Sequence, residues 1–358
     1  MKNVLLIVGT SLVNAGVPNV IMNIVRFLYK KISFDIIVGS SEPGYFDEEF
    51  LSYGGEIIRY DKFLYKDGCI KFVRSGRQLY DIVDQVLKKK KYDAVHCHNG
   101  FLAGWALQAA YEQHVPVRIS HSHGTFLLNG KNPFVRLFKL ISLNKGIKYS
   151  THRLACSDIA GKTLFMGCDF ENVLNPINVR SFDFPKQIHK GINLLQIGYY
   201  CPLKNQLFSL QVLKELKKRN VEVKMNFIGF ELTSGYIDKM NYYISQHGLE
   251  GNVNFLPSDY PKEKIFPVTD FLLLPSLSEG LPLSSLESQC SDIYTIVSDV
   301  VTKDIDMGIC SFLPNNNVEK WVNEIIIKSN CAQHVNRDII KKFDVTCFID
   351  NILKKYIE

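Results

Sequence analysis

Short apolar runs alternate with longer stretches of helical periodicity along the chain. In the first half, five runs rich in Val, Ile and Leu are separated by segments whose apolar positions recur every three or four residues. The runs are KNVLLIVG, FDIIVGS, GEIIRY, YDAVHCH and VPVRISHSH. Such an alternation predicts βαβ units, in which helices cover both faces of a parallel sheet.

The pattern stops near residues 175–190, where two prolines occur in a stretch without periodicity, and then starts again. In the second half we predict strands at INLLQIG, VEVKMNFIG, VNFLPS, DFLLLPS and IYTIVSD, and helices over 204–219, 234–247, 261–267 and 284–290. The final segment, FDVTCFIDNILKKYIE, has the pattern of an amphipathic helix. We therefore predict an α/β protein of two doubly wound domains, with the carboxyl ends of their strands facing a cleft.

Length and composition agree with this organisation. The 358 residues fit two domains of ordinary size, and a content of 46% hydrophobic and 22% charged residues is typical of a folded soluble protein. No run of about 18 apolar residues occurs, and the apolar run at the N-terminus is too short for a signal peptide. Nine scattered cysteines without a C-x-x-C pair indicate reduced thiols and a cytoplasmic location.

The net charge of +6 is concentrated in the first half of the chain. Residues 1–179 hold 22 Lys and Arg against 15 Asp and Glu, a balance of +7, and the remainder holds 20 against 21, a balance of −1. A basic half favours an acidic partner or an anionic surface. The basic residues are too sparse, and too little interleaved with aromatic residues, for nucleic-acid binding.

Ligands of an open α/β sheet bind beyond the carboxyl ends of the strands, and four such ends carry distinctive residues. The first is VGTSLVNAG, in which Gly16 precedes a predicted helix. A glycine there permits a ligand to approach the backbone closely, although a loop glycine at positive φ explains it equally well. The segment does not have the G-x-G-x-x-G spacing of a dinucleotide site.

The second strand end is QIGYYCPLKNQ, in which Lys204 and Asn205 lie where a helix is predicted to begin. A lysine opposes the helix dipole at this end, where negative charge is favoured. Its position indicates an anionic ligand between the lysine and the helix, and a solvated surface lysine is the alternative.

The third strand end is PSLSEGLPLSSLE, which places Glu279 and Glu287 eight positions apart. Gly280 and Leu281 precede a helix whose first amides could hold a phosphate. Ser284 and Glu287 also have the S-x-x-E spacing of a capping box, and on this local pattern a cap explains Glu287 better than a ligand does.

The fourth feature is a pair of His-x-His strand ends, one with His96 and His98 and the other with His121 and His123. Alternate strand positions share a face, so a metal site is conceivable. No carboxylate motif accompanies these histidines, and we expect no metal. A histidine at the carboxyl end of a strand is better interpreted as a polar contact to the substrate.

In this combination and order, the segments resemble the retaining family-4 glycosyltransferases of the GT-B fold, which act in bacterial capsule, exopolysaccharide and O-antigen synthesis. Residues 279–287 match the family's E-x7-E motif, Gly198 with Lys204 and Asn205 matches its G-R-x5-K-N loop, and Ala15 with Gly16 resembles its N-terminal glycine loop. The segments RISHSHGT, STHRLACS and LNPIN resemble further parts of the family pattern.

The resemblance covers nearly the whole chain and implies its domain organisation. Residues 1–180 would form an acceptor-side Rossmann-like domain, and 181–340 would form the nucleotide-sugar-binding Rossmann-like domain. Residues 341–358 would form a C-terminal helix that packs back on the N-terminal domain.

Carried over position by position, the resemblance also implies roles for individual residues. Gly16, Lys204 and the amides of Gly280 and Leu281 would surround the donor diphosphate, and Glu287 would hold the ribose hydroxyls. The implied catalytic residues are His123, Glu279 and Lys204. The implied donor-binding residues are Gly16, Gly198, Tyr199, Lys204, Asn205, Glu279, Gly280, Leu281 and Glu287.

Glu279 would lie against the donor sugar near its anomeric carbon, with His123 on the opposite wall. Three departures from the family pattern stand out. Tyr199 replaces the usual arginine, Pro18 replaces a glutamate, and Asp292 replaces a glycine. The loss of the arginine leaves neutralisation of the diphosphate mainly to Lys204.

The implied activity is that of a hexosyltransferase, with a UDP-sugar as the expected donor and a lipid-linked glycan as the acceptor. We find no convincing D-x-D metal motif, since Asp304 and Asp306 lie in a predicted loop. We therefore expect no cofactor and no metal, because lysine and helix-terminal amides can stabilise the leaving phosphate. The alternatives are a nucleotide-sugar epimerase of the same architecture and a non-catalytic sugar-nucleotide-binding subunit, which the change at Tyr199 keeps open.

A last expectation concerns the basic half of the chain. In residues 133–149 an apolar helix face is predicted, flanked by basic side chains. Its apolar members are Phe134, Leu137, Phe138 and Ile141, and its basic members are Arg136, Lys139 and Lys145. We expect this helix to dock on the cytoplasmic face of an anionic membrane, and a helix packed on the domain core is the alternative.

Overall fold

The chain folds into two compact units in the computed structural model. One unit comprises Met1–Pro176 and Val345–Glu358, and the other comprises Ile177–Asp344. The structure describes residues 1–60, 69–124, 132–182, 184–331 and 334–357, without the side chains of 69–73. We call the two parts the N-terminal unit and the C-terminal unit.

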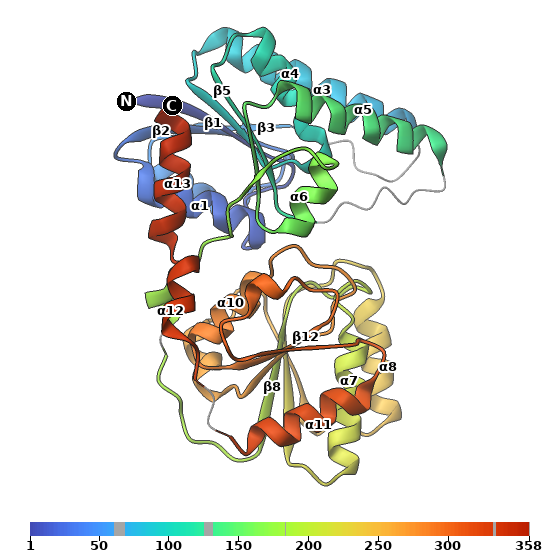
Figure 1. The fold of residues 1–358 in the computed structure, drawn as a ribbon. Coiled ribbons are helices and arrows are strands. Elements are labelled where there is room, and N and C mark those ends of the chain that lie inside the picture. Colours follow the sequence, from blue (N-terminus) through green and yellow to red (C-terminus); the bar gives the residue numbers. More distant parts are fainter. Residues whose placement is uncertain (61–68, 125–131, 183, 332–333, 358) are drawn as a thin grey trace. The chain divides into compact units, whose positions relative to one another are not determined.

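The N-terminal unit is built on a seven-stranded sheet in the order β3-β2-β1-β4-β5-β6-β7, with parallel neighbours throughout (Figure 1). Its strands are β1 Lys2–Val8, β2 Ile32–Val38, β3 Ile57–Arg59, β4 Ala94–Cys97, β5 Val117–Ser122, β6 His152–Ala155 and β7 Glu171–Asn172. Its helices are α1 Gly16–Leu28, α2 Asp47–Ser52, α3 Cys69–Lys89, α4 Ala103–Glu112, α5 Pro133–Tyr149, α6 Asp158–Phe165 and α13 Val345–Ile357.

Helices cover both faces of this sheet, which explains why its central strands are continuously apolar. The inner residues of β1, Val4 to Val8, are buried. On one face α13 packs against α1 and β1, and on the other α3, α4 and α5 pack against one another. Helix α13, which follows the C-terminal unit in sequence, thus belongs to the core of the N-terminal unit.

The C-terminal unit has a six-stranded parallel sheet in the order β10-β9-β8-β11-β12-β13. Its strands are β8 Ile192–Ile197, β9 Val223–Ile228, β10 Val253–Leu256, β11 Phe271–Leu274, β12 Tyr294–Ser298 and β13 Cys310–Leu313. Its helices are α7 Gln206–Lys218, α8 Tyr236–Gln246, α9 Lys262–Ile265, α10 Leu283–Cys290, α11 Val318–Ser329 and α12 Arg337–Ile340.

Both sheets have a point where the chain order changes direction. It lies between β1 and β4 in the first sheet and between β8 and β11 in the second. The loops after neighbouring strands diverge there, which leaves space for a ligand at the carboxyl ends. The fold therefore predicts that the residues that follow β1, β4, β8 and β11 contact the ligand.

Candidate active site

An ion pair joins the loops that follow β8 and β11. Lys204 Nζ lies 2.6 Å from Glu279 Oε1, which also accepts a hydrogen bond from Ser276 Oγ at 2.6 Å. The two charged side chains are 21% and 9% exposed. Lys204, whose charge opposes the helix dipole at the start of α7, thus has a largely buried carboxylate as its partner.

The loop after β8 is shaped by two unusual backbone conformations. Gly198 has φ +152°, and a Cβ added to it would lie 3.6 Å from the side-chain carbons of Lys204. Asn205 adopts the left-handed conformation at φ +55°, which asparagine tolerates well, and is the N-cap residue of α7. Its Nδ2 donates to the carbonyl oxygen of Pro275 at 3.2 Å, which ties the start of α7 to the end of β11.

Tyr199 follows Gly198, where the family resemblance predicts an arginine. Its ring is half-buried and meets the ring of Phe230 edge to face at a centroid distance of 4.7 Å. Burial raises the pKa of its hydroxyl, so the side chain stays neutral and contributes an aromatic surface.

Glu287 does not cap a helix. The N-cap residue of α10 is Pro282, without a side-chain cap, and Ser284 lies inside the helix. The capping-box interpretation is therefore wrong. Instead, Glu287 Oε2 lies 2.6 Å from Lys262 Nζ, and the two side chains are 12% and 33% exposed.

Gly280 and Leu281 lie between β11 and α10, directly after Glu279. Gly280 is half-buried, and Leu281 is 4% exposed. This short connection therefore carries a paired carboxylate and two consecutive amides between the switch-point strand β11 and the start of α10.

Gly16 is the first residue of α1, after the extended N-cap residue Ala15. Its φ is not positive, so the interpretation as a left-handed loop glycine is wrong. A Cβ added to it would meet no atom within 4 Å. The backbone at this helix start is thus open to close approach, as a ligand-binding glycine requires.

Four histidines at the carboxyl ends of β4 and β5 form a connected group that we call the histidine ladder: His96 and His121 in the strands, and His98 and His123 directly after them. His96 Nε2 lies 3.1 Å from His121 Nδ1, and His98 Nδ1 lies 2.7 Å from His123 Nε2. Parallel pairing of β4 and β5 and the two-residue period bring all four rings to one face of the sheet.

The ladder ends on two polar side chains from distant segments. His96 Nδ1 lies 2.7 Å from the hydroxyl of Tyr356 on α13, and His123 Nδ1 lies 3.1 Å from Asn175 Oδ1. Both ring nitrogens of His123 therefore have partners within the unit. Burial lowers the pKa of His123 to about 4, so the ring is neutral at physiological pH.

Nitrogen atoms of His96, His98 and His121 lie within 4.8 Å of one another. They are the ligand type that zinc and other transition metals accept, but their group contains no carboxylate. The hydrogen bonds within the ladder already use several of these nitrogens. That the site takes no metal stays a prediction.

Two departures from the family pattern have a local structural explanation. Asp292 has φ +53°, a conformation that favours glycine, and its Oδ1 accepts a hydrogen bond from the Val335 amide at 2.8 Å. Pro18 is buried in the first turn of α1, where proline is well tolerated.

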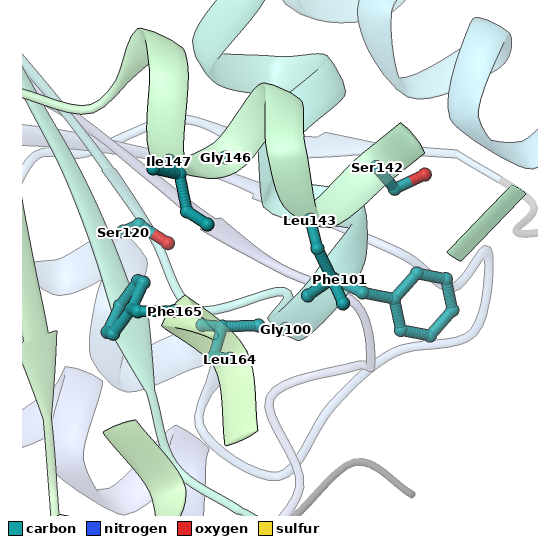
Figure 2. Close-up of a pocket in the computed structure, with 9 residues that line it drawn as sticks. All are labelled: Gly100, Phe101, Ser120, Ser142, Leu143, Gly146, Ile147, Leu164 and Phe165. Carbon is teal, nitrogen blue, oxygen red and sulfur yellow. The ribbon is translucent and has the colours of Figure 1, made fainter. Parts of the chain in front are cut away.

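Two cavities among the described residues lie away from the Lys204–Glu279 pair, from Glu287 and from the histidine ladder. One is a cavity too narrow to hold a water molecule, and it is lined by Gly100, Phe101, Ser120, Ser142, Leu143, Gly146, Ile147, Leu164 and Phe165 (Figure 2). Ser120 alternates with His121 on β5, so this cavity lies on the sheet face opposite the ladder. The other, of about 370 Å³, borders Ile192 and Phe271, which begin β8 and β11. Neither lies at a carboxyl strand end.

Comparison with known proteins assigns the chain to a family. Residues 180–341 match the model of the glycosyl transferases group 1, and residues 15–166 match the model of glycosyltransferase family 4. EpsF of Bacillus subtilis (strain 168) is 28% identical over 347 residues, covering 91% of this chain and 88% of that protein. The capsular polysaccharide biosynthesis glycosyltransferase CapH of Staphylococcus aureus is 27% identical, covering 78% and 76%.

A third relative is the UDP-Gal:alpha-D-GlcNAc-diphosphoundecaprenol alpha-1,3-galactosyltransferase of Escherichia coli, which is 24% identical and covers 81% of this chain and 80% of that protein. Among solved structures, Anabaena HepE in complex with UDP superposes with a TM-score of 0.74 at 13% identity, covering 99% of each chain. The two family models together span most of the sequence, and the fold agrees with them. The chain therefore belongs to the family-4 type of GT-B glycosyltransferases and is a hexosyltransferase of polysaccharide biosynthesis.

Proposed function

We propose that this glycosyltransferase moves a sugar from a UDP-sugar to a lipid-linked glycan, with retention of the anomeric configuration and without a divalent metal. The observation that carries the proposal is the ion pair of Lys204 and Glu279, which joins the loops after β8 and β11. Ligands of open α/β sheets bind at this switch point. A UDP complex of HepE and the donor and acceptor named for the Escherichia coli relative support the choice of substrates.

In this proposal, Lys204 neutralises the donor diphosphate. The amides of Gly280 and Leu281 add hydrogen-bond donors from the connection before α10, and Gly198 leaves room beside the lysine stem. Because these groups are held before the donor arrives, they can stabilise the charge that develops on the leaving phosphate.

The remaining residues of the C-terminal unit orient the donor. Glu287 accepts hydrogen bonds from the ribose hydroxyls, and Glu279 lies against the sugar with one oxygen held by Lys204 and Ser276. Asn205 fixes the loop after β8 to the end of β11. Tyr199 gives the site an aromatic wall in place of a cation.

From the N-terminal unit, Gly16 lets the donor phosphate approach the start of α1, and His123 presents a neutral ring to the sugar. The acceptor hydroxyl oxygen bonds to the anomeric carbon while the bond from that carbon to the phosphate oxygen breaks. The bonding electrons leave with UDP, and the acceptor proton passes to the leaving phosphate oxygen. Attack from the face that the phosphate leaves gives retention.

Metal independence is proposed because lysine and amides supply the positive potential that a metal ion supplies elsewhere. The carboxylates of the D-x-D sequence at Asp304 and Asp306 make local contacts. Asp304 Oδ2 accepts from Thr302 Oγ1 at 2.6 Å, and Asp306 Oδ1 accepts from the Gly308 amide at 2.8 Å. These two aspartates therefore stabilise their own turn.

The acceptor side is proposed to work at the cytoplasmic face of an anionic membrane. On α5, Phe134, Leu137 and Ile141 are 68%, 56% and 43% exposed, spaced as one helix face. Phe138, which we had predicted on this face, is instead buried in the unit. Among the described helices none is long and apolar enough to cross a membrane, so contact with lipid through α5 would be peripheral.

Flotation with liposomes tests this contact. The wild-type chain should float with anionic liposomes at low salt, and the double variant Phe134→Ser/Leu137→Ser should float markedly less. Equal recovery of the wild type with neutral and anionic lipid would remove the proposed membrane contact.

Transfer itself is tested by nucleotide release from a panel of nucleotide-sugars, with and without a detergent extract of bacterial membranes and with and without chelator. Release of UDP that depends on the extract and survives the chelator is expected. A sugar epimerised without any acceptor would favour an epimerase, and no release with any donor would favour a non-catalytic subunit. Loss of transfer in chelator, restored by magnesium or manganese, would show that the metal-free mechanism is wrong.

A further inference from the structure

Lys262 is the partner of Glu287, and no sequence motif pointed to it. It is the first residue of α9, and its Nζ lies 2.6 Å from Glu287 Oε2 on α10. The ammonium also lies 5.3 Å from the centroid of the Phe182 ring, a distance at which a cation is attracted to the ring face. Lys262 is thus held between a carboxylate and an aromatic ring.

The Phe182 ring is itself fixed by the core of the C-terminal unit. It packs against Phe266 at a centroid distance of 6.2 Å, and its backbone carbonyl accepts a hydrogen bond from the hydroxyl of Ser291. Lys262, Glu287 and Phe182 come from three segments that are far apart in sequence. Their contact is therefore a product of the tertiary fold and is held in one geometry.

The charges of this region can be compared with those of the proposed ligand. A nucleotide diphosphate is an anion, and the proposed donor site contains two carboxylates, Glu279 and Glu287. Each of them is paired with a lysine at 2.6 Å, Glu279 with Lys204 and Glu287 with Lys262. We call these two ion pairs the lysine–carboxylate pairs. Their charges cancel, so the carboxylates need not repel the diphosphate.

The geometry of the second pair also leaves Glu287 able to bind a ligand. A carboxylate has two oxygens and about four lone-pair directions, and Lys262 occupies one of them through Oε2. Two vicinal ribose hydroxyls can donate to the others. With Lys262 removed, the Glu287 carboxylate would be free to turn and its charge would be uncompensated.

We propose that Lys262 is a positioning residue for the nucleotide donor, which fixes the Glu287 carboxylate for the ribose hydroxyls and offsets its charge near the diphosphate. This inference rests on the proposed function and extends it to a residue outside the family motifs. It predicts that Lys262 contributes to the recognition of ribose without touching the sugar being transferred.

The test is calorimetric titration of the full chain with UDP and with 2′-deoxy-UDP. Lys262→Met keeps the length and apolar stem of the side chain, and it should weaken UDP binding about tenfold. This is the lower end of the loss of metal affinity that follows when the hydrogen-bond partner of a metal ligand is removed, which we take as the guide here. It should also reduce the preference for UDP over 2′-deoxy-UDP. Lys262→Arg, which keeps the charge, should recover UDP affinity to within about threefold of the wild type.

Lys214→Met is the matched control. Lys214 lies on α7, and its ammonium is 5.7 Å from the ring centroid of Tyr243, so the same substitution removes a lysine that also stacks on an aromatic ring. Its affinity for UDP should equal that of the wild type. Thermal melts without nucleotide confirm that each variant is folded.

The outcomes separate the inference from the function on which it rests. Wild-type UDP affinity in folded Lys262→Met, or an equal loss for UDP and 2′-deoxy-UDP, overturns the positioning role. If Glu287→Gln leaves UDP affinity unchanged, the ribose assignment itself fails and the role of Lys262 fails with it. If Glu287→Gln weakens UDP binding and Lys262→Met does not, only the inference about Lys262 is wrong.

Discussion

The polar side chains at the carboxyl strand ends are stabilised in different ways in the two units. In the C-terminal unit, the lysine–carboxylate pairs hold two largely buried carboxylates, each with a lysine ammonium at 2.6 Å. In the N-terminal unit, the histidine ladder consists of imidazoles that hydrogen-bond to one another. Burial lowers the pKa of His96, His98 and His121 well below the ordinary value, so these rings are uncharged at neutral pH.

The difference follows from what each group is proposed to contact. A diphosphate is an anion, and a lysine held beside a carboxylate can face it without being an unpaired buried ion. A sugar is neutral, so the wall proposed to contact it needs shape and hydrogen bonds but no charge. The comparison therefore predicts that the two units respond differently to acid, to substitution and to added charge.

Acid is expected to give the largest difference. The fully buried rings of the ladder have depressed pKa values in the native state, whereas an unfolded histidine titrates near 6.5. Below about pH 6.5 these histidines bind protons in the unfolded chain but not in the native unit. The free energy of unfolding therefore falls by about 1.4 kcal/mol per pH unit for each such histidine. Above that pH these groups contribute no pH dependence.

Hydrogen exchange between pH 7.5 and 5, corrected for the intrinsic rate, measures this effect unit by unit. Peptides from β4 and β5 should lose protection as the pH falls, while peptides from β8 and β9 serve as the internal control. Equal loss of protection in both units would contradict the proposed role of the ladder in acid sensitivity.

Removing Lys204 is expected to have the next largest effect. Lys204→Met leaves the buried Glu279 carboxylate without its partner and removes the charge proposed to stabilise the leaving phosphate. Loss of one preorganised group of this kind costs roughly 10²–10³ in turnover, about 2.7–4 kcal/mol. Initial rates of UDP release measure it, with Lys217→Met at the far end of α7 as the control. A turnover within threefold of the wild type would remove Lys204 from the mechanism.

The fold of the two units could be predicted from the sequence, whereas the partners of their functional side chains could not. Alternating strand and helix patterns predicted the α/β fold, and the predicted helix over 204–219 agrees with α7 within two residues. These are local signals, because a strand buried on both faces is continuously apolar. The edge strand β13, whose four residues are only half-buried, was missed for the same reason. Helix α11 was also missed, although its apolar residues Val318, Trp321, Val322 and Ile325 recur with helical period.

The partners of the functional side chains were beyond the reach of local patterns. Tyr356 meets His96 across 260 positions, and Lys262 meets Glu287 across 25. The S-x-x-E spacing predicted Ser284 as the partner of Glu287. That prediction is wrong because α10 begins at Leu283, so Ser284 lies inside the helix and does not cap it. Which residue pairs with a charge is decided by tertiary packing, and only the structure shows it.

Substitution of Glu287 tests whether the Lys262–Glu287 pair contributes to nucleotide binding. Glu287→Ala should weaken UDP binding by at least about tenfold, since a charge-assisted hydrogen bond contributes roughly 1.5–3 kcal/mol and 1.4 kcal/mol is one decade. Glu287→Gln, with one acceptor, should fall between alanine and the wild type. Titration calorimetry measures both.

Ser284→Ala is the control for this prediction. Since Ser284 lies inside α10, its loss should leave both UDP affinity and the melting temperature nearly unchanged. Destabilisation of Ser284→Ala by roughly 0.5–2 kcal/mol, with UDP affinity unchanged in Glu287→Ala, would restore the capping interpretation.

The smallest effect is expected from adding charge to the C-terminal unit at Tyr199. Tyr199→Arg restores the family residue beside Gly198 and should tighten UDP binding roughly fivefold at low salt, because one more charge near a solvated phosphate is worth about 1 kcal/mol. The variant also loses the edge-to-face contact with Phe230, so a slightly lower melting temperature is expected. Tyr199→Phe keeps that ring contact without a charge and should bind UDP like the wild type. Since the gain is electrostatic, it should vanish at 1 M salt, where charges more than about 3 Å apart are screened. A Tyr199→Arg protein that binds UDP no better at low salt would mean that residue 199 does not face the diphosphate.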